Sequence, residues 1–407
     1  MLRSILIVVC SLLLPLSYST LTHAESVMTL DKALKLVLNR SPLVKEVESS
    51  FLIRAAESQD VRRLNNPKLE LSYGSVTTNN TDGEEIEFSL EQPIRLSDLS
   101  ARTRLSRVMQ EVNNFEQQKQ LLDLFVEVKH AYARTWILNQ RKRVLQKSLS
   151  QIASLTKMFS SGSQLGAYGK GELSLVRAEI AKLKAELLGI DAAILVSSSE
   201  LTRLVGASID HASLKAPEID VLTNLETIQD KLSSGSSKLQ QRIRLLSKVA
   251  ERESSVASSD SFPELRPKLF YSKTDDGLDI FGVGVSFDLP VFDQNSTQRS
   301  KSNASLNLAK SNQQYFASPE FVESVMNIAR AFNLKKAQLE IYENDVLPSL
   351  QKSFTIFEKQ TSSGGGDAFK LWQVLNEYID THEEYSKMWT ETLSERSRLE
   401  VLLEEEI

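Results

Sequence analysis

Three short stretches of this sequence occur twice, in the same order and at nearly the same separation. The matching pairs are PKL at 67 and 267, IEFSLEQPI at 86 with VGVSFDLPV at 283, and SSG at 160 and 362. Their offsets are 200, 197 and 202 residues, and three independent matches rarely agree so closely by chance. The pattern therefore predicts an internal two-fold repeat, in which one structural unit is used twice.

Each predicted repeat has the same order of elements: a helix, two short strands, a long helix, a Gly-rich turn and another helix. The first repeat is expected over 25–206 and the second over 222–407. The segment 207–221, which contains HASLKAPEID, is expected to link them. In the second repeat Pro319 lies inside the long helical pattern, and it predicts a kink or a break there.

Heptad spacing of apolar residues marks the helices. Before the Gly-rich turn, apolar residues recur every seven positions from Leu138 to Phe159, and neither Pro nor Gly occurs between Leu99 and Phe159. After the turn, intervals of three and four alternate over more than four heptads, with the polar Ser197 in one slot. The apolar positions after the turn are Leu173, Val176, Ile180, Leu183, Leu187, Ile190, Ile194, Leu201 and Leu204. Such patterns are typical of coiled coils. A similar rhythm predicts an opening helix over 30–51.

The Gly-rich stretch SSGSQLGAYGKGE at 160–172 looks like a phosphate-binding loop, but its spacing is wrong. The first glycine of such a loop would have to stand at Gln164, and Lys170 is followed by Gly171 rather than by Ser or Thr. The glycines instead predict a turn between two long antiparallel helices, because reversing the chain there needs backbone angles with φ > 0.

Four short segments, two in each repeat, alternate between apolar and polar residues. Each has about the nine to eleven residues that cross a bilayer as a tilted strand, and polar loops connect them. The predicted membrane-facing residues are Leu69, Leu71, Tyr73, Ile86, Phe88, Leu90, Leu269, Tyr271, Val283, Val285, Phe287 and Leu289. A small soluble sheet that caps the coiled coil shows the same alternation, so this alternative stays open.

A sheet in a membrane has to close into a barrel, and this requirement restricts how the four strands can be used. Four strands cannot close a barrel, and an open sheet edge is not tolerated in lipid. Several chains must therefore pool their strands: two chains would give eight and three would give twelve. The predicted fold class is mainly α with a small β part, in which long antiparallel coiled-coil helices form an α-barrel and four strands per chain join a transmembrane β-barrel.

The N-terminus has the composition of a secretory signal peptide. Arg3 precedes an apolar run that contains Cys10, and Thr22-His23-Ala24 resembles a cleavage site, which predicts a signal peptide over 1–24. The remaining chain has no cysteine, so disulfides cannot hold it together. Its 47 Lys and Arg against 53 Asp and Glu give a net charge of −6, which argues against binding to nucleic acid.

No motif in the chain predicts chemistry. The four histidines are scattered, and His382-Glu383-Glu384 starts like a zinc-protease motif but has Ser386 where the second histidine should stand. No Gly-x-Ser-x-Gly elbow occurs. The protein is therefore expected not to be an enzyme, with no catalytic, cofactor-binding or metal site.

These features together resemble the TolC-type outer-membrane efflux family over essentially the whole mature sequence. The stretches that carry the resemblance are MTLDKALKLVLNRSPLVKEVE, NNPKLELSYG, EFSLEQPI, GKGELSLVRAEIAKLKAEL, TRLVG at 202–206, and PVFD followed by a long helix. GKGELSLVRAEIAKLKAEL resembles in particular the heavy-metal or cation-efflux branch. Ser41-Pro42 stands where the family usually has Asn-Pro.

The resemblance implies a homotrimer in the outer membrane of a Gram-negative bacterium, with a twelve-stranded β-barrel in lipid and a twelve-helix α-barrel in the periplasm. It implies the exit duct of a tripartite efflux system: a passive channel that receives substrate from an inner-membrane pump of the RND type and a periplasmic adaptor (membrane fusion) protein. The alternative is a soluble periplasmic coiled-coil adaptor or scaffold, which would be released without detergent.

The resemblance also assigns the two helix–turn–helix tips to the periplasmic mouth, where adaptor hairpins dock. The tip residues are Gly162, Leu165, Gly166, Tyr168, Gly169, Lys170, Gly171, Ser363, Gly364, Gly365, Gly366 and Asp367. The positions that narrow the pore in some family members correspond to Ser174, Arg177, Gln373 and Asn376. None of these four is acidic, so a polar or steric constriction is expected rather than a carboxylate ring that binds cations.

Overall fold

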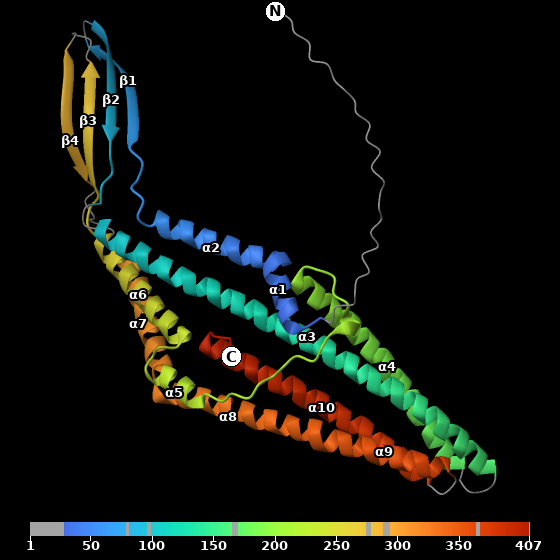
Figure 1. Ribbon diagram of the computed structural model, residues 1–407. Coiled ribbons are helices and arrows are strands. Elements are labelled where there is room, and N and C mark those ends of the chain that lie inside the picture. The colour runs from blue at the N-terminus through green and yellow to red at the C-terminus, as the bar shows by residue number, and fades with distance from the viewer. Residues whose placement is uncertain are drawn as a thin grey trace, which may run out of the picture.

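The computed structural model describes residues 28–78, 81–95, 99–164, 170–273, 278–287, 294–363 and 367–406. The predicted signal peptide over 1–24 lies outside these residues. A four-stranded sheet stands at one end of the molecule, and long helices run from its foot to two tips at the other end (Figure 1). The prediction of a mainly helical chain with a small β part is confirmed.

The sheet is made of two hairpins, one from each half of the chain. Its strands are β1 (Lys68–Thr78), β2 (Thr81–Glu91), β3 (Leu265–Lys273) and β4 (Asp279–Phe287). They pair antiparallel in the order β1-β2-β3-β4, so the β2–β3 pairing joins the two halves. The strands have 11, 11, 9 and 9 residues, and all four predicted strands are confirmed.

The first helical hairpin consists of α3 (Leu99–Gln164) and α4 (Lys170–Val205). The 66 residues of α3 extend for about 99 Å at 1.5 Å per residue. The predicted heptad positions on α4 are buried or half-buried, with Leu183 only 1% exposed, and Ser197 is fully buried in its slot. The Ser197 hydroxyl donates to the carbonyl of Ile194 at 3.2 Å, which satisfies this buried polar group within the helix.

The second half is broken into more pieces. Its helices are α5 (Leu225–Ser233), α6 (Lys238–Ser259), α7 (Ser296–Phe316), α8 (Pro319–Ile341), the π-helix η2 (Tyr342–Val346), α9 (Leu347–Ser362) and α10 (Ala368–Leu403). The predicted break at Pro319 is confirmed: α7 stops before it, and the Ser318 side chain accepts from the N–H of Phe321 at 3.2 Å. The π turn directly precedes Pro348, whose ring cannot fit against a regular α-helical turn before it.

The opening segment differs from the single helix that the sequence predicted. It forms α1 (Leu30–Arg40) and α2 (Pro42–Asp60), with extended backbone at Ser41 between them. A residue before proline is disfavoured in the α region, and Ser41 instead caps α2 by accepting from the N–H of Leu43 at 3.3 Å. Gly206, at the end of α4, has φ +72° and lies against this break. A Cβ there would stand 2.5 Å from the Arg40 carbonyl oxygen.

The segment between the halves is held on the helical body. It contains the 3-10 turn η1 (His211–Ser213), and a bridge pairs Leu214 with Met28. The hydroxyl of the buried Tyr132 on α3 lies 2.7 Å from the Met28 carbonyl oxygen and 2.8 Å from that of Lys215. Burial raises the pKa of Tyr132 to about 12, which keeps this hydroxyl protonated and able to donate.

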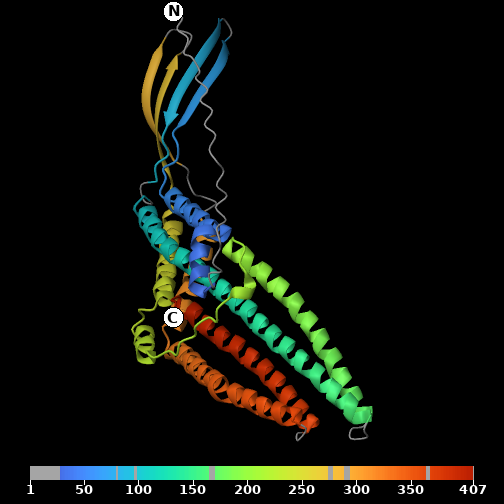
Figure 2. The same cartoon turned by 45° about the vertical axis from the view of Figure 1, so that its right-hand side comes forward.

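The helical body has two main apolar cores. The upper one gathers side chains from α1, α3, α4, α8 and α10, including Tyr132, Phe332 and Leu399. The lower one joins the two hairpins near their tips, and it contains Ile152 and Val176 from the first hairpin with Phe354 and Leu371 from the second. The two tips therefore lie side by side, as both views show (Figures 1 and 2).

Candidate functional site

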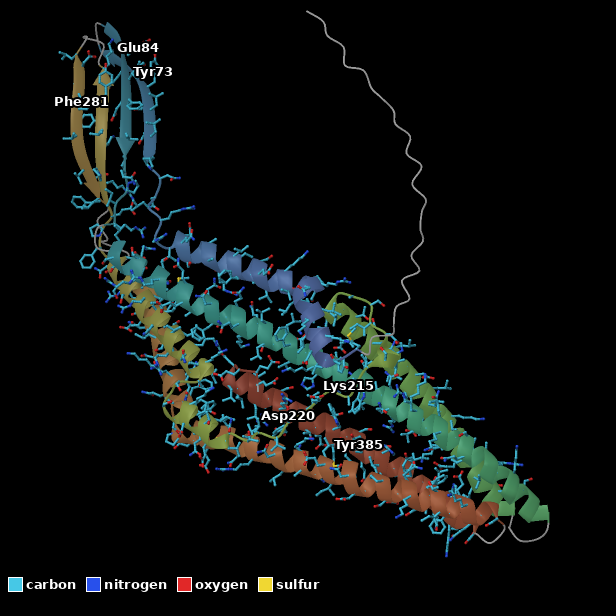
Figure 3. The ribbon with its side chains drawn as sticks, in the orientation of Figure 1. Tyr73, Glu84, Lys215, Asp220, Phe281 and Tyr385 are labelled. Carbon is cyan, nitrogen blue, oxygen red and sulfur yellow. The ribbon has the colours of Figure 1, made fainter. Side chains whose placement is uncertain are left out.

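One face of the sheet carries nearly all of its large apolar side chains. The ladder aligns Leu71, Phe88, Tyr271 and Phe281 across the four strands, and the next row aligns Leu69, Leu90, Leu269 and Val283. Eleven of the twelve predicted membrane-facing residues lie on this face, and Leu289 lies outside the described residues. Their side chains are exposed, up to 76% for Val283 (Figure 3). The sheet thus presents a continuous apolar surface that no described helix covers.

The opposite face is polar and internally paired. Lys268 contacts Glu87 at 3.2 Å, and Ser272 donates to Glu85 at 3.1 Å. Apolar residues on this face include Ile280, opposite Ser272, and Phe270. Phe270 lies over Gly282 on the neighbouring strand, where any Cβ would overlap its ring. The alternation in the sequence therefore corresponds to two faces of different chemistry, with the water-compatible one opposite the apolar one.

The outer edges of the sheet, β1 and β4, have no neighbouring strand among the residues that the structure describes. Unpaired N–H and C=O groups along an edge are a ready template for another strand. In lipid such an edge would leave these groups unsatisfied. Within the described part of one chain, the sheet therefore has two open edges and an uncovered apolar face.

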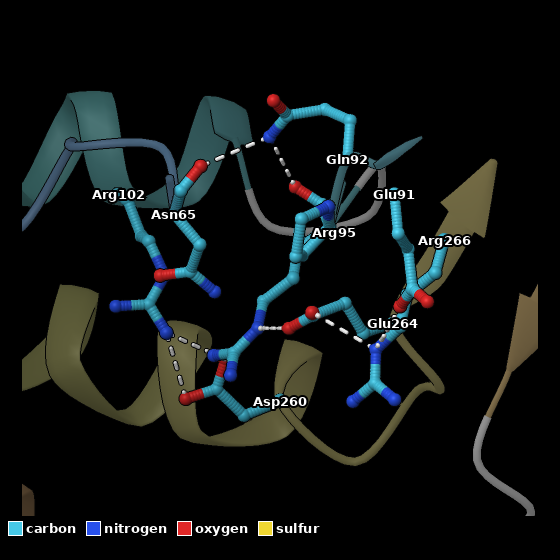
Figure 4. A network of polar contacts seen from close by, with 9 residues as sticks. Asn65, Glu91, Gln92, Arg95, Arg102, Asp260, Glu264 and Arg266 are labelled. Carbon is cyan, nitrogen blue, oxygen red and sulfur yellow. Dashed lines mark hydrogen bonds and ion pairs between the residues drawn. The ribbon is translucent and has the colours of Figure 1, made fainter. Parts of the chain in front are cut away.

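A polar network fixes the foot of the sheet to the helices (Figure 4). Arg102 on α3 contacts Asp260 at 2.7 Å, and Arg95 contacts Glu264 at 2.8 Å. Two backbone hydrogen bonds, at 2.8 and 3.0 Å, continue the pairing between Ile94 and Leu265 below the strands. Sequence reasoning missed this network, since no spacing rule relates Arg102 to a carboxylate 158 residues away.

The predicted tip residues fall at the ends of the two hairpins. Gly162 lies in the last turns of α3, Lys170 and Gly171 begin α4, and Ser363 ends α9. Asp367 caps α10 by accepting from the N–H of Phe369 at 2.9 Å. The other predicted tip residues lie outside the described residues: Leu165, Gly166, Tyr168, Gly169, Gly364, Gly365 and Gly366.

The four predicted pore residues lie on the first turns of α4 and α10. Ser174, Arg177 and Gln373 are exposed, whereas Asn376 is half-buried. The buried Oδ1 of Asn376 has no hydrogen-bond partner among the described residues, and neither has Nε1 of Trp372 one turn earlier. The structure thus places the four residues on two neighbouring helix starts, next to the lower core.

A cluster of titratable side chains lies beside the π turn. Tyr385 on α10 donates to Glu343 at 2.7 Å, and Tyr342 donates to Glu384 at 3.2 Å, so each element supplies one tyrosine and one carboxylate. Burial raises the pKa of Tyr385 and lowers that of the neighbouring His382 to about 4. No sequence pattern indicated these pairs, because they depend on the register between η2 and α10.

Two kinds of feature are absent from the residues that the structure describes. No group of three or more His, Cys, Asp or Glu side chains within them could hold a metal ion. None of the helices in this part of the chain is both long enough and apolar enough to span a bilayer.

Several solved structures of similar shape are named as outer-membrane proteins or outer-membrane channels. The outer membrane protein VceC of Vibrio cholerae aligns with a TM-score of 0.70 and 15% identity, covering 92% of this chain and 95% of that one. The CmeC outer membrane channel of Campylobacter jejuni aligns with a TM-score of 0.71 and 13% identity, covering 92% of this chain and 85% of that one. The open-state MtrE outer membrane channel of Neisseria gonorrhoeae aligns with a TM-score of 0.71 and 12% identity, covering 92% of this chain and 89% of that one. No protein-family model and no curated protein matches the sequence.

These alignments cover sheet and helices together, so they define the class of fold: this chain has the architecture of outer-membrane channels. The resemblance to TolC-type outer-membrane efflux proteins is confirmed at this level. At 12–15% identity the shared property is the fold itself.

Proposed function

We propose that this protein is the exit duct of a tripartite efflux system in the outer membrane of a Gram-negative bacterium. It carries substrate passively from an inner-membrane pump and a periplasmic adaptor to the exterior, without catalytic chemistry of its own. The observation that carries the proposal is the sheet, with its exposed apolar face and two edges that no described strand pairs with. Lipid would cover such a face, and strands of further copies would pair with such edges.

Three copies would pool twelve strands, enough for a closed barrel that leaves a lumen. In this arrangement β1 of one copy pairs with β4 of the next. The apolar face turns to lipid, and the polar face with Glu87 and Lys268 lines the interior.

The helical body offers matching lateral surfaces. In the lower part, α4 packs on α3, α3 on α10, and α10 on α8 and α9, so α4 and α8 with α9 are the outer helices of the layer. Leu188 and Leu195 on α4 are exposed and seven residues apart, as are Leu334 and Ile341 on α8. Such stripes fit coiled-coil packing between neighbouring copies and support the closed α-barrel.

We assign the paired tips to the periplasmic mouth and to the adaptor. Their support is the shared lower core, which makes the two tips one surface. Ser174, Arg177, Gln373 and Asn376 stand directly behind that surface and would form a polar constriction when three copies close. The two repeats, 25–206 and 222–407, then supply equivalent halves of the wall. The family resemblance assigns the pump to the RND type.

The test is fractionation of the mature protein, followed by its mass in detergent by light scattering. We expect a membrane-bound particle of three chains, and loss of export when the gene is deleted. A soluble monomer or dimer, released without detergent, would contradict the proposal and would favour the periplasmic scaffold, because four strands per chain could then not be closing a barrel in lipid.

A further inference from the structure

A small cavity lies at the foot of the sheet, where the helices meet it. It has a volume of about 150 Å³ and is lined by the end of α2, the segment after β2 and the start of α3. Four of its lining side chains are arginines: Arg62, Arg63, Arg95 and Arg102. Asp60 is the one carboxylate among the lining residues, so the wall favours an anion.

The four arginines are not equivalent. Arg95 and Arg102 are held by Asp260 and Glu264 in the junction network (Figure 4), so they form a fixed wall. Among the described residues, the Arg63 side chain forms an ion pair only with Asp60, at 3.3 Å, and such a solvent-exposed pair contributes little to stability. Arg62 makes no ion pair with any residue that the structure describes. Two guanidinium groups, those of Arg62 and Arg63, are therefore available to a ligand.

Apolar side chains surround the same cavity. Leu64 and Leu99 line it, and they are 55% and 49% exposed. Lys68, the first residue of β1, follows four positions after Leu64, so the cavity lies at the foot of β1. Basic residues beside exposed apolar ones at the end of a membrane segment are typical of the headgroup region.

We propose that this cavity binds the phosphate group of an anionic phospholipid in the adjacent leaflet. Arg62 and Arg63 contact the phosphate oxygens, for which a guanidinium group has a matching planar set of donors. Leu64 and Leu99 contact the glycerol and the start of the acyl chains. This assignment rests on the proposed function, which places the sheet in a membrane. The leucines distinguish a lipid from free phosphate, since a soluble anion gains nothing from them.

The test measures the unfolding temperature of the full-length protein in detergent as phosphatidylglycerol is titrated into the micelles. Phosphatidylglycerol is expected to raise it more than zwitterionic phosphatidylcholine at the same mole fraction. In R62Q/R63Q the half-saturating mole fraction of phosphatidylglycerol should rise about tenfold, because each basic residue near a membrane surface adds to the attraction. The matched control is R203Q/R398Q, which removes two exposed arginines elsewhere on the helices and should behave like the wild type.

Equal effects of the two lipids on the wild-type protein would overturn the proposal, and so would an unchanged titration of R62Q/R63Q. If inorganic phosphate gave the same rise, the site would bind phosphate but not lipid, and the lipid assignment would be wrong. The mass and fractionation of the same preparations separate the two proposals. A trimeric membrane protein without lipid preference contradicts only this inference, whereas a soluble wild-type protein contradicts the proposed function.

Discussion

The helical body and the sheet use the same apolar residue types in opposite ways. On α10, Leu371 and Leu375 are 3% and 0% exposed, because α3, α4 and α9 cover them within one chain. In the sheet, Leu71 and Val283 are 72% and 76% exposed. Burial of such side chains stabilises a fold by roughly 1.5–3 kcal/mol each. One chain therefore supplies this energy to its helices. In the proposed assembly, the sheet gains it from lipid and from other copies.

The comparison predicts its largest effect for charges on the apolar face. L71R/V283R should abolish the membrane-bound particle, since an arginine facing lipid near the bilayer midplane costs about 2–4 kcal/mol. The matched pair S72R/S286R places the same charges on the polar face and should still reach the membrane. Fractionation followed by light scattering measures both. Equal behaviour of the two pairs would show that the apolar face does not contact lipid.

Within α4, two leucines about one and a half turns apart allow folding and assembly to be tested separately. Leu183 is buried in the lower core, whereas Leu188 is exposed. L183A should lower the free energy of unfolding by about 2–5 kcal/mol in any state of assembly, because it leaves a cavity. L188A/L195A should leave the folding of the single chain within about 0.5 kcal/mol of the wild type but weaken association.

Circular dichroism melting and the concentration dependence of the mass measure these two properties. A change in neither for L188A/L195A would mean that α4 is not a contact between copies.

Backbone geometry gives a smaller effect at a single glycine. G206A should destabilise the protein by about 1–2 kcal/mol or more, since φ is +72° there and the new Cβ would meet the Arg40 carbonyl. G189A is the matched control: Gly189 lies inside α4 with open space around its Cβ position, and the change should stabilise the helix by about 0.5–1 kcal/mol. Thermal unfolding compares them. Similar shifts of the unfolding temperature in G206A and G189A would show that the break at Ser41 tolerates a side chain at position 206.

The smallest predicted effect concerns pH. Burial lowers the pKa of His382 from 6.5 to about 4, so between these values the unfolded chain binds a proton that the folded chain does not. The free energy of unfolding should therefore fall as the pH falls through this window. We expect H382Q to lose about 1 kcal/mol less than the wild type between pH 7 and 4.5, since solvent screens this partly exposed site. Denaturant unfolding at both pH values measures the difference, and equal losses would contradict the assigned cause.

Periodicity made much of this structure predictable. The alternation at 69–73 and 86–90 predicted the strands. The heptads predicted the helices α3 and α4, on which the heptad residues Leu145 and Leu183 are buried. The proline at position 319 also predicted the break between α7 and α8, because proline does not fit inside a regular helix. The break at Ser41-Pro42 could have been predicted by the same rule, but the regular apolar spacing from Leu30 to Phe51 concealed it.

The sites were less predictable than the fold. The apolar face of the sheet followed from alternation, because its residues share one periodicity. The junction network did not, since Arg102 and Asp260 meet only when the two halves pair through β2 and β3. The π turn and the Tyr385–Glu343 contact likewise depend on how η2 lies against α10. The cavity lined by Arg62 and Leu99 combines three segments that no local pattern connects.

The sequence by itself determined the local elements of this protein, because the periods of strands and helices are properties of the backbone that any apolar pattern must follow. It also determined that the sheet would have one apolar face. Only the tertiary structure decided that this face stays uncovered by the helices, that both tips share one core, and that arginines gather at the foot of the sheet. These properties depend on contacts between residues far apart in the chain, and the energies of such contacts are set by packing rather than by spacing.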